Sequence, residues 1–236
     1  MIRHNSEMEM LTRSAAIVVE NISKVYATPD GPLRVLDNIN FMAAQSESIA
    51  IVGVSGSGKS TLLALLAGLD LPTNGTIQIH GENLSAANED ERARLRNLYV
   101  GFVFQQFHLL PNLTALENVA LPLELRADAD ADRHALTALS QVGLASRVQH
   151  FPRQLSGGEQ QRVAIARAYC SQPRILFADE PTGNLDAKTA AKIADLLFEL
   201  NDEYATTLVL VTHDEGLASR CNRRVRLEDG RLQAES

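Results

Sequence analysis

The chain has 236 residues, of which 45% are hydrophobic and 22% charged, and its formal net charge is -7. This length predicts one large domain rather than a string of modules, and this composition excludes a chain that is disordered throughout. Because general nucleic-acid binders carry a basic surface, the acidic balance argues against binding of DNA or RNA. The two cysteines, Cys170 and Cys221, lack metal-ligand spacing and suit a reducing cytosol.

The sequence contains no apolar run close to the ~20 residues that span a bilayer. Its longest runs cover only residues 62–66 and 208–211, and residues 1–14 are polar, without the hydrophobic core of a signal peptide. We therefore expect a flexible tail at 1–14, one domain at 15–236, and a cytoplasmic protein with no direct membrane insertion, which reaches a membrane only through a partner.

The first part of the chain alternates between short β-like runs and turns, which predicts a small antiparallel sheet. Its expected strands are residues 17–20, 24–26 and 36–42. Residues 48–52 form a compact apolar run that fits a strand buried on both faces. A helix at 60–67 should follow and end at Gly68, and a further strand is expected at 76–80.

Strands and helices alternate through the rest of the chain, and this rhythm predicts an α/β fold with a mostly parallel sheet. The expected strands are residues 99–104, 175–178 and 208–212, and the expected helices are 89–96, 114 to about 145, a helix entered by a loop within 155–170, and 188–201. Thr114 and Glu117 have the spacing of a capping box, and Asp229-Gly230 is typical of a hairpin turn. The helical middle is expected to be an insertion into the sheet.

Residues 53–60 read Gly-Val-Ser-Gly-Ser-Gly-Lys-Ser and match the phosphate-loop pattern G-x-x-x-x-G-K-[ST] in full. The glycines let backbone N–H groups turn toward phosphate oxygens, and the helix that follows adds the positive end of its dipole. Lys59 supplies a charge for the β- and γ-phosphates, and the Ser60 hydroxyl can bind Mg²⁺. The predicted nucleotide contacts here are Gly53, Ser55, Gly56, Ser57, Gly58, Lys59, Ser60 and Thr61. The motif alone leaves kinases, GTPases, motors and transporters open.

Two carboxylates, Asp179 and Glu180, follow the apolar run 175–178, and ligands of open α/β sheets lie at the carboxyl ends of strands. Asp179 is placed to hold Mg²⁺, and Glu180 to orient or deprotonate the attacking water. A strand that merely ends in a charged turn is the alternative, and it becomes weak beside a phosphate loop. His213 follows the next apolar run, and its spacing alone fits an ordinary polar loop residue better than a γ-phosphate contact.

Residues 155–160 read Leu-Ser-Gly-Gly-Glu-Gln, and Ser156 and Glu159 have the spacing of a capping box. That structural interpretation leaves the glycines unexplained, because each glycine in a first turn costs up to ~1 kcal/mol against alanine. Gly157 and Gly158 point instead to a helix start that an anion approaches closely. A second anion-binding helix start indicates contact with a nucleotide held by another copy of the chain.

These three motifs occur in the order found in the ATP-binding subunits of ABC transporters, and the chain resembles that family from about residue 17 to 232. The resemblance implies a P-loop NTPase (RecA-like) core, an N-terminal antiparallel β subdomain and an inserted helical subdomain at about 106–170. It also implies four roles: stacking on adenine for Tyr26, contact with Mg²⁺ and water for Gln105, a dimer-interface acid for Asp186, and sensing of the γ-phosphate for His213.

The segment 181–186, Pro-Thr-Gly-Asn-Leu-Asp, departs from the Ser-Ala-Leu-Asp form of many members at Gly183 and Asn184. It is similar to the branch that contains the lipoprotein-release, macrolide-export and YbbA-type ATPases. The resemblance implies an ATPase that uses ATP and Mg²⁺, dimerises around ATP and powers a separate membrane permease from the inner face of the cell membrane. Export, or mechanical extraction of a lipoprotein, lipid or peptide, would be the outcome.

Two alternatives to transport remain. A regulatory scaffold of a membrane complex would share the same ATP chemistry, whereas a small-molecule kinase has no need of residues 155–160. If a permease docks near Gln105, some of the apolar side chains around it should be exposed rather than buried in the helical subdomain. The candidates are Phe104, Phe107, Leu109, Leu110 and Leu113.

Overall fold

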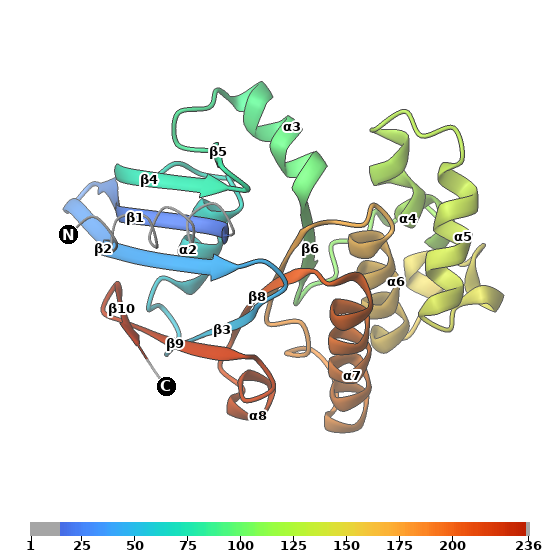
Figure 1. The fold of residues 1–236 in the computed structure, drawn as a ribbon. Helices are drawn as coiled ribbons and strands as arrows, with labels where there is room; N and C mark the ends of the chain where they lie inside the picture. The colour runs from blue at the N-terminus through green and yellow to red at the C-terminus, as the bar shows by residue number, and fades with distance from the viewer. Residues whose placement is uncertain (1–14, 235–236) are drawn as a thin grey trace, which may run out of the picture. The chain divides into compact units, whose positions relative to one another are not determined.

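The computed structural model describes residues 15–234 and divides into two compact units (Figure 1). Unit 1 comprises the described residues up to Arg96 together with those from Ala205 onward, and unit 2 comprises Asn97–Tyr204. The tail predicted at 1–14 lies outside the described residues. Within the described part of the chain, no helix has both the length and the apolar character needed to cross a bilayer.

Unit 1 begins with an antiparallel sheet whose strand order is β2-β1-β4-β5, as Figure 1 shows for its three longest strands. The strands are β1 (Ala15–Thr28), β2 (Gly31–Ala44), β4 (Asn74–Ile79) and β5 (Glu82–Asn83). The two short runs predicted at 17–20 and 24–26 are parts of the single strand β1. Its pairing with β2 shifts register between Val19 and Ile22, where Asn21 has a φ of 52°, so a bulge interrupts the alternation.

The second strand set of unit 1 is built around β3 (Ser48–Val52), which pairs in parallel with β8 (Thr207–Thr212) and β9 (Arg223–Glu228). All five residues of β3 are buried, as its apolar run predicts. The predicted hairpin joins β9 to β10 (Arg231–Ala234). The helices are α2 (Lys59–Leu66), which ends before Gly68 at a φ of 67°, α8 (Glu215–Ala218), and α3 (Glu89–Tyr99), whose last residues begin unit 2.

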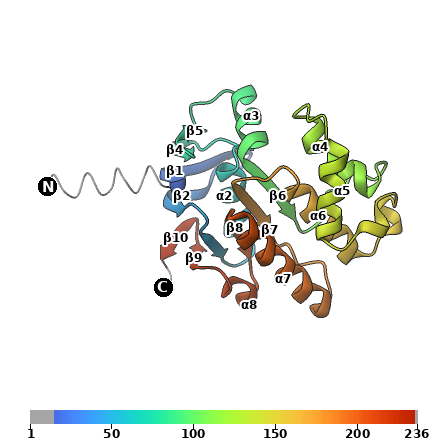
Figure 2. The ribbon, with the colours of Figure 1, turned by 45° about the vertical axis from the view of Figure 1, so that its right-hand side comes forward.

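Unit 2 holds two parallel strands and most of the helices. The strands are β6 (Val100–Phe104) and β7 (Ile175–Asp179), and the helices are α4 (Ala115–Glu124), α5 (Ala131–Gln141), α6 (Gly157–Tyr169) and α7 (Ala187–Tyr204). Single 3-10 turns occupy Ala145–Arg147 and Pro152–Gln154. Helix α6 packs on α4, α5 and α7, and Figure 2 shows this group of helices together.

The helical stretch predicted from 114 to about 145 is two helices rather than one. The break falls at residues 125–130, where Ala127 takes a φ of 56° and the Asp128 carboxylate bonds to the His134 ring at 2.9 Å. The capping box predicted for Thr114 and Glu117 is confirmed at the start of α4. The fold class is also confirmed, since an antiparallel β subdomain accompanies mainly parallel strands and helices.

Candidate active site

The phosphate-loop segment lies in unit 1, between the buried strand β3 and helix α2. Lys59 is the first residue of α2, and its Nζ donates to the carbonyl oxygens of Gly53 and Val54, at 2.8 Å each. The N–H of Ser57 donates to the Val54 carbonyl at 3.2 Å, which closes a turn in the middle of the loop. The loop is therefore compact, and its lysine is held at the loop rather than extended into solvent.

The start of α2 is unusually open to an anion. Its N-cap, Gly58, has a left-handed φ of 100°, no side chain in the described part of the chain caps it, and its first turn has no acidic residue. Within the residues that the structure describes, the buried Oγ of Ser57 also finds no hydrogen-bond partner. A helix start without a side-chain cap, an unsatisfied hydroxyl and an ammonium group together fit a phosphate chain.

Packing requires a glycine at position 53, for a reason that the motif does not reveal. A Cβ at this position would collide with the carbonyl oxygen of Leu227 on β9. The first glycine of the loop is therefore required by the close approach of β9, in addition to any contact with phosphate.

The other predicted residues of unit 1 are Tyr26 and His213. Tyr26 lies on β1 and is 38% exposed, and its phenol is within hydrogen-bonding reach of Thr61 in the first turn of α2. His213 directly follows β8 and is exposed, ahead of Asp214, which caps α8. Unit 1 thus brings Tyr26 and the phosphate loop together around α2.

In unit 2 the acidic pair ends strand β7. Asp179 is its last residue, and Glu180 follows with a φ of 46°, a left-handed conformation that costs a side chain of this kind about 1–3 kcal/mol. The turn is anchored on both sides, since the Gly183 N–H donates to the Glu180 carbonyl at 3.0 Å, and the buried Gln161 donates from Nε2 to the Pro181 carbonyl at 2.6 Å. Because Gln161 lies on α6, that helix fixes the backbone that carries Glu180. Nothing in the sequence pattern indicated this contact.

Gln105 follows β6 and pairs with Asn184 through two hydrogen bonds. Its Nε2 donates to the Asn184 Oδ1 at 3.0 Å, and the Asn184 Nδ2 donates to the Gln105 carbonyl at 2.9 Å. Asn184 is one of the two positions at which the sequence departs from the form common in the family. The departure therefore has a structural role, because it ties the residue after β6 to the loop before α7.

The capping box predicted for Ser156 and Glu159 is confirmed at the start of α6. The Glu159 N–H donates to the Ser156 Oγ at 3.3 Å, and Ser156 returns bonds from its N–H and its hydroxyl to the Glu159 carboxylate, both at 2.8 Å. The bonds from the Ser156 backbone and hydroxyl, and then the Arg147 guanidinium, lower the pKa of Glu159 to about 2. The start of α6 thus carries an ionised carboxylate at neutral pH.

Packing explains the second glycine of this segment. A Cβ at Gly158 would lie 2.5 Å from the Thr189 Cγ2 on α7, whereas a Cβ at Gly157 would meet the Leu185 Cδ2 at an ordinary 3.5 Å. Asp186 begins α7 locally, since its Oδ1 accepts from the N–H groups of Lys188 and Thr189 at 3.1 and 3.0 Å. The bonds from Thr189 and Lys188 hold the pKa of Asp186 below its ordinary value.

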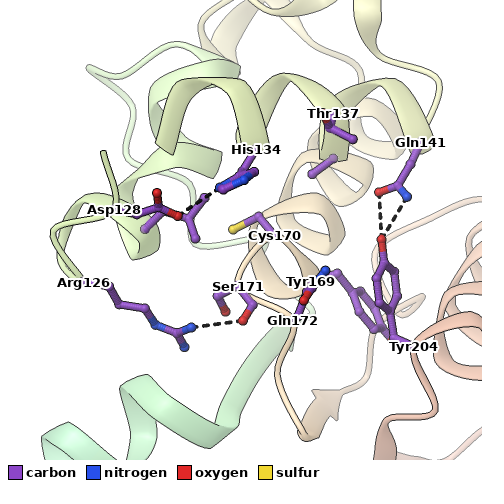
Figure 3. Close-up of a pocket in the computed structure, with 12 residues that line it drawn as sticks. Arg126, Asp128, His134, Thr137, Gln141, Tyr169, Cys170, Ser171, Gln172 and Tyr204 are labelled. Atoms are coloured by element: carbon purple, nitrogen blue, oxygen red, sulfur yellow. Dashed lines mark hydrogen bonds and ion pairs between the residues drawn. The ribbon is translucent and has the colours of Figure 1, made fainter. Parts of the chain in front are cut away.

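A hollow of about 270 Å³ lies in unit 2, and none of the predicted site residues lines it (Figure 3). Several of its polar groups bond to one another or to the backbone: Asp128 to His134, Gln141 to Tyr204, and Arg126 to the Ser171 carbonyl. Among the described residues, the buried hydroxyl of Tyr169 finds no hydrogen-bond partner. Burial raises the pKa of the Cys170 thiol at its wall to about 12, although Arg126 and Arg167 act in the opposite direction. A thiol with so high a pKa is protonated at neutral pH, which disfavours its action as a nucleophile.

Residues 36–183 match the family model described as ABC transporter, and the chain therefore belongs to this family of ATP-binding proteins. It is 52% identical over 222 residues to the uncharacterized ABC transporter ATP-binding protein YbbA of Escherichia coli K12, covering 93% of this chain and 97% of that protein. It is 47% identical to the lipoprotein-releasing system ATP-binding protein LolD of Alcanivorax borkumensis, over 95% and 99% of the two chains.

The fold agrees with that assignment. The solved dimeric ATP-binding cassette MJ0796, bound to ADP and Pi after hydrolysis, matches with a TM-score of 0.86 and 42% identity over 93% of this chain and 97% of the other. The chain is accordingly an ABC ATPase, the ATP-binding subunit that powers a transporter, and the predicted resemblance to the YbbA and lipoprotein-release branch is confirmed. Membership of this family also excludes the alternative function of a small-molecule kinase.

Proposed function

We propose that two copies of this chain hold two ATP–Mg²⁺ between them, head to tail, and that closing and opening of this dimer drives a separate membrane permease. The observation that carries the proposal is the pair of glycine-rich helix starts. Among the described residues, no side chain caps the start of α2 in unit 1, which carries Lys59, while α6 in unit 2 begins with Gly157 and Gly158. A two-fold dimer lets each triphosphate meet one start from each copy. The MJ0796 cassette, which was solved as a dimer, supports this arrangement.

The reaction is hydrolysis of the γ-phosphate. Glu180 accepts the proton of the attacking water, and Lys59, together with the opposing start of α6, offsets the charge that develops on the phosphoryl group. His213 contacts the γ-phosphate, and Tyr26 stacks on the adenine. Asp186 extends toward the dimer interface.

Three residues would hold the magnesium ion: Ser60, Gln105 and Asp179. Their hydroxyl, amide and carboxylate oxygens are the hard ligands that Mg²⁺ prefers, alongside phosphate oxygens and water. When bound, the ion would offset the negative charge of the triphosphate.

The permease would hold the protein at the inner face of the cell membrane. The names of the YbbA and LolD relatives support a transport role, and for this chain we propose export, or extraction of a lipoprotein, lipid or peptide. Of the apolar side chains at the end of β6 and after it, Leu110 is 45% exposed, while Phe104, Phe107, Leu109 and Leu113 are half-buried. Leu110 is therefore the first candidate for the docking surface. Leu110→Asp should keep basal ATPase and lose the permease in co-purification; retention of the complex would move docking elsewhere.

The variant Glu180→Gln tests the mechanism most directly. It keeps the shape and a hydrogen bond but removes the base, so ATP should bind while hydrolysis falls on the order of 10²-fold or more. Sedimentation velocity should then show a dimer that forms with ATP, and adding Ser156→Arg to this background should prevent it. Near-normal turnover would remove Glu180 from its role, and a dimer indifferent to both ATP and Ser156 would refute the shared site. Cargo transport in vesicles with the permease separates a transporter from a scaffold.

A further inference from the structure

The ring of Tyr26 is exposed and yet fixed at its polar end and on one face. Its phenol donates to the Asp70 Oδ2 at 3.0 Å, and the Lys24 Nζ lies over the ring, 4.8 Å from its centroid. Lys24 and Tyr26 both lie on β1, where the pairing with β2 shifts register between Lys24 and Val25, and the Lys24 ammonium nevertheless lies over the Tyr26 ring. An exposed aromatic ring gains little from burial, so these contacts are not explained by core packing.

The Asp70 carboxylate connects the side chains of Lys24 and Tyr26. Its other oxygen, Oδ1, accepts from the Lys24 Nζ at 2.8 Å and from the Leu71 N–H at 2.7 Å, and the Lys24 Nζ also donates to the Leu71 carbonyl at 2.7 Å. The Lys24 side chain is only 11% exposed, so the ion pair is partly shielded from solvent. Although burial acts to raise it, the bonds from Lys24, Leu71 and Tyr26 hold the pKa of Asp70 below its ordinary value.

Asp70 also belongs to the segment that ends α2. Its N–H and that of Leu69 both donate to the Ala64 carbonyl of α2, at 3.3 and 2.9 Å. The segment that follows is bound along β1, since the Thr73 N–H donates to the Ser23 carbonyl at 2.8 Å and the Val25 N–H donates to the Thr73 hydroxyl at 3.0 Å. The carboxylate that fixes Tyr26 is thus held by the same helix whose first turn carries the phosphate loop.

From this geometry we infer that Lys24 and Asp70 are positioning residues that fix the Tyr26 ring at a set place relative to the phosphate loop, so that the base of a bound nucleotide meets a preformed stacking surface. The inference rests on the proposed role of Tyr26 in stacking. Preorganisation of this kind increases affinity because the ring loses less freedom when the base arrives. The purine end of the ligand is affected, whereas the phosphate end is not.

The test compares ATP with inorganic tripolyphosphate, which has no base, as ligands of the full chain in titration calorimetry. Tyr26→Phe removes the phenol but keeps the ring, Asp70→Ala removes its acceptor, and Lys24→Met removes the ammonium while keeping the stem. Each should weaken ATP binding about three- to tenfold, the size expected for one lost hydrogen bond, and should leave tripolyphosphate binding within about twofold. For Lys24→Met and Asp70→Ala, the kcat at saturating ATP should be unchanged while KM rises, because these residues act only through the position of the ring.

Two further variants control for folding and for loss of any surface carboxylate. Asp70→Asn keeps an acceptor for the Leu71 N–H and should still weaken ATP binding if the charge on Asp70 matters. Asp37→Asn removes a carboxylate of the same unit that is paired with Arg34 and Arg231, and it should leave both ligands unaffected. If Asp70 acts through the phenol, the double variant Tyr26→Phe/Asp70→Ala should bind ATP no more weakly than the worse single variant.

The outcomes separate the inference from the function on which it rests. If Tyr26→Ala binds ATP as the parent does, the stacking role itself is wrong. If Tyr26→Ala loses affinity while Tyr26→Phe, Asp70→Ala and Lys24→Met keep it, stacking stands and the positioning role is overturned. Additive losses in the double variant, or equal losses for ATP and tripolyphosphate, would likewise overturn it.

Discussion

The starts of α2 and α6 are both rich in glycine, but they differ in their capping and in the charge of their first turn. The start of α2 follows Gly58, has no side-chain cap within the described residues, and carries the ammonium of Lys59. The start of α6 is closed by its own capping box and carries the ionised Glu159, which is only partly offset by Arg147. This difference in local charge supports the proposal that the start of α2 binds the triphosphate first and that the start of α6 completes the site in the dimer.

The largest effect should come from the start of α2. Lys59→Ala removes the only charge that the first turn of this helix offers a phosphate, so ATP hydrolysis should fall on the order of 10²- to 10³-fold and ATP binding should be lost in calorimetry. Ser156→Arg should instead bind ATP about as well as the parent and fail at dimerisation. If Ser156→Arg loses ATP binding as severely as Lys59→Ala, the two helix starts do not differ in the way described.

Mixing the two variants should restore part of the activity. Each should be inactive alone, but a mixed dimer contains one composite site with both lesions and one with neither. ATPase assays on mixtures at several ratios, with the two separate variants as controls, measure the recovery. No recovery at any ratio, although mixed dimers form, would indicate that both sites must work together.

Gly158→Ala should destabilise the protein by about 1–3 kcal/mol, the usual cost of overpacking, because the new Cβ would lie 2.5 Å from the Thr189 Cγ2. Gly157→Ala is the matched control and should be neutral or slightly stabilising, since its Cβ has room and alanine favours a helix. Thr189→Ser removes the offending methyl and should rescue Gly158→Ala in urea unfolding. Equal effects of the two glycine variants would show that the contact with α7 does not matter.

The capping carboxylate gives α6 a dependence on pH that α2 lacks. Since the pKa of Glu159 is lowered from 4.5 to about 2, its contribution to stability is complete above pH 4.5 and is lost as the pH falls toward 2. Urea unfolding from pH 6 to pH 2.5 should show the parent more stable than Glu159→Gln at the upper end, with the gap narrowing as the pH falls. A constant gap would mean that the charge of Glu159 does not contribute.

The smallest effect separates capping from ligand contact. Ser156→Ala and Thr114→Ala each remove the hydroxyl of a capping box, and each should cost about 1 kcal/mol in urea unfolding. Only Ser156→Ala should also weaken ATP-driven dimerisation in the Glu180→Gln background. Equal dimerisation by the two variants would confine Ser156 to its structural role.

Local signals in the sequence predicted most elements but not their interruptions. β3 was predictable to its ends because its apolar run is continuous, and both capping boxes follow from residues three positions apart. The break between α4 and α5 was not predicted, because Ala127 takes a left-handed φ that alanine does not signal. Nor does a pattern in sequence indicate the bulge in β1 at Asn21.

The candidate site likewise has features that the sequence predicted and features that it did not. Motif spacing identified the phosphate loop, the acidic pair and the start of α6, whereas the contacts that support them join residues far apart in sequence. Gln161 bonds to Pro181 across 20 residues and Gln105 to Asn184 across 79. Such partners depend on how β6, α6 and α7 pack, and a short motif carries no information on that packing. The roles assigned to individual site residues remain predictions that the variants above address.

The close approach of Leu227 to Gly53 bears on when the phosphate loop can fold during synthesis of the chain. Strand β3, which leads into the phosphate loop, pairs on both sides with strands from the end of the chain: Ile51 lies opposite Val211 and Val225. When residues 53–60 have just emerged from the ribosome, β8 and β9 have not yet been synthesised. The strand that leads into the loop therefore lacks both of its partner strands. Pairing over such sequence distances also forms slowly. We therefore expect a newly synthesised chain to acquire nucleotide binding late, and a chain truncated before β8 to carry the motif without binding ATP.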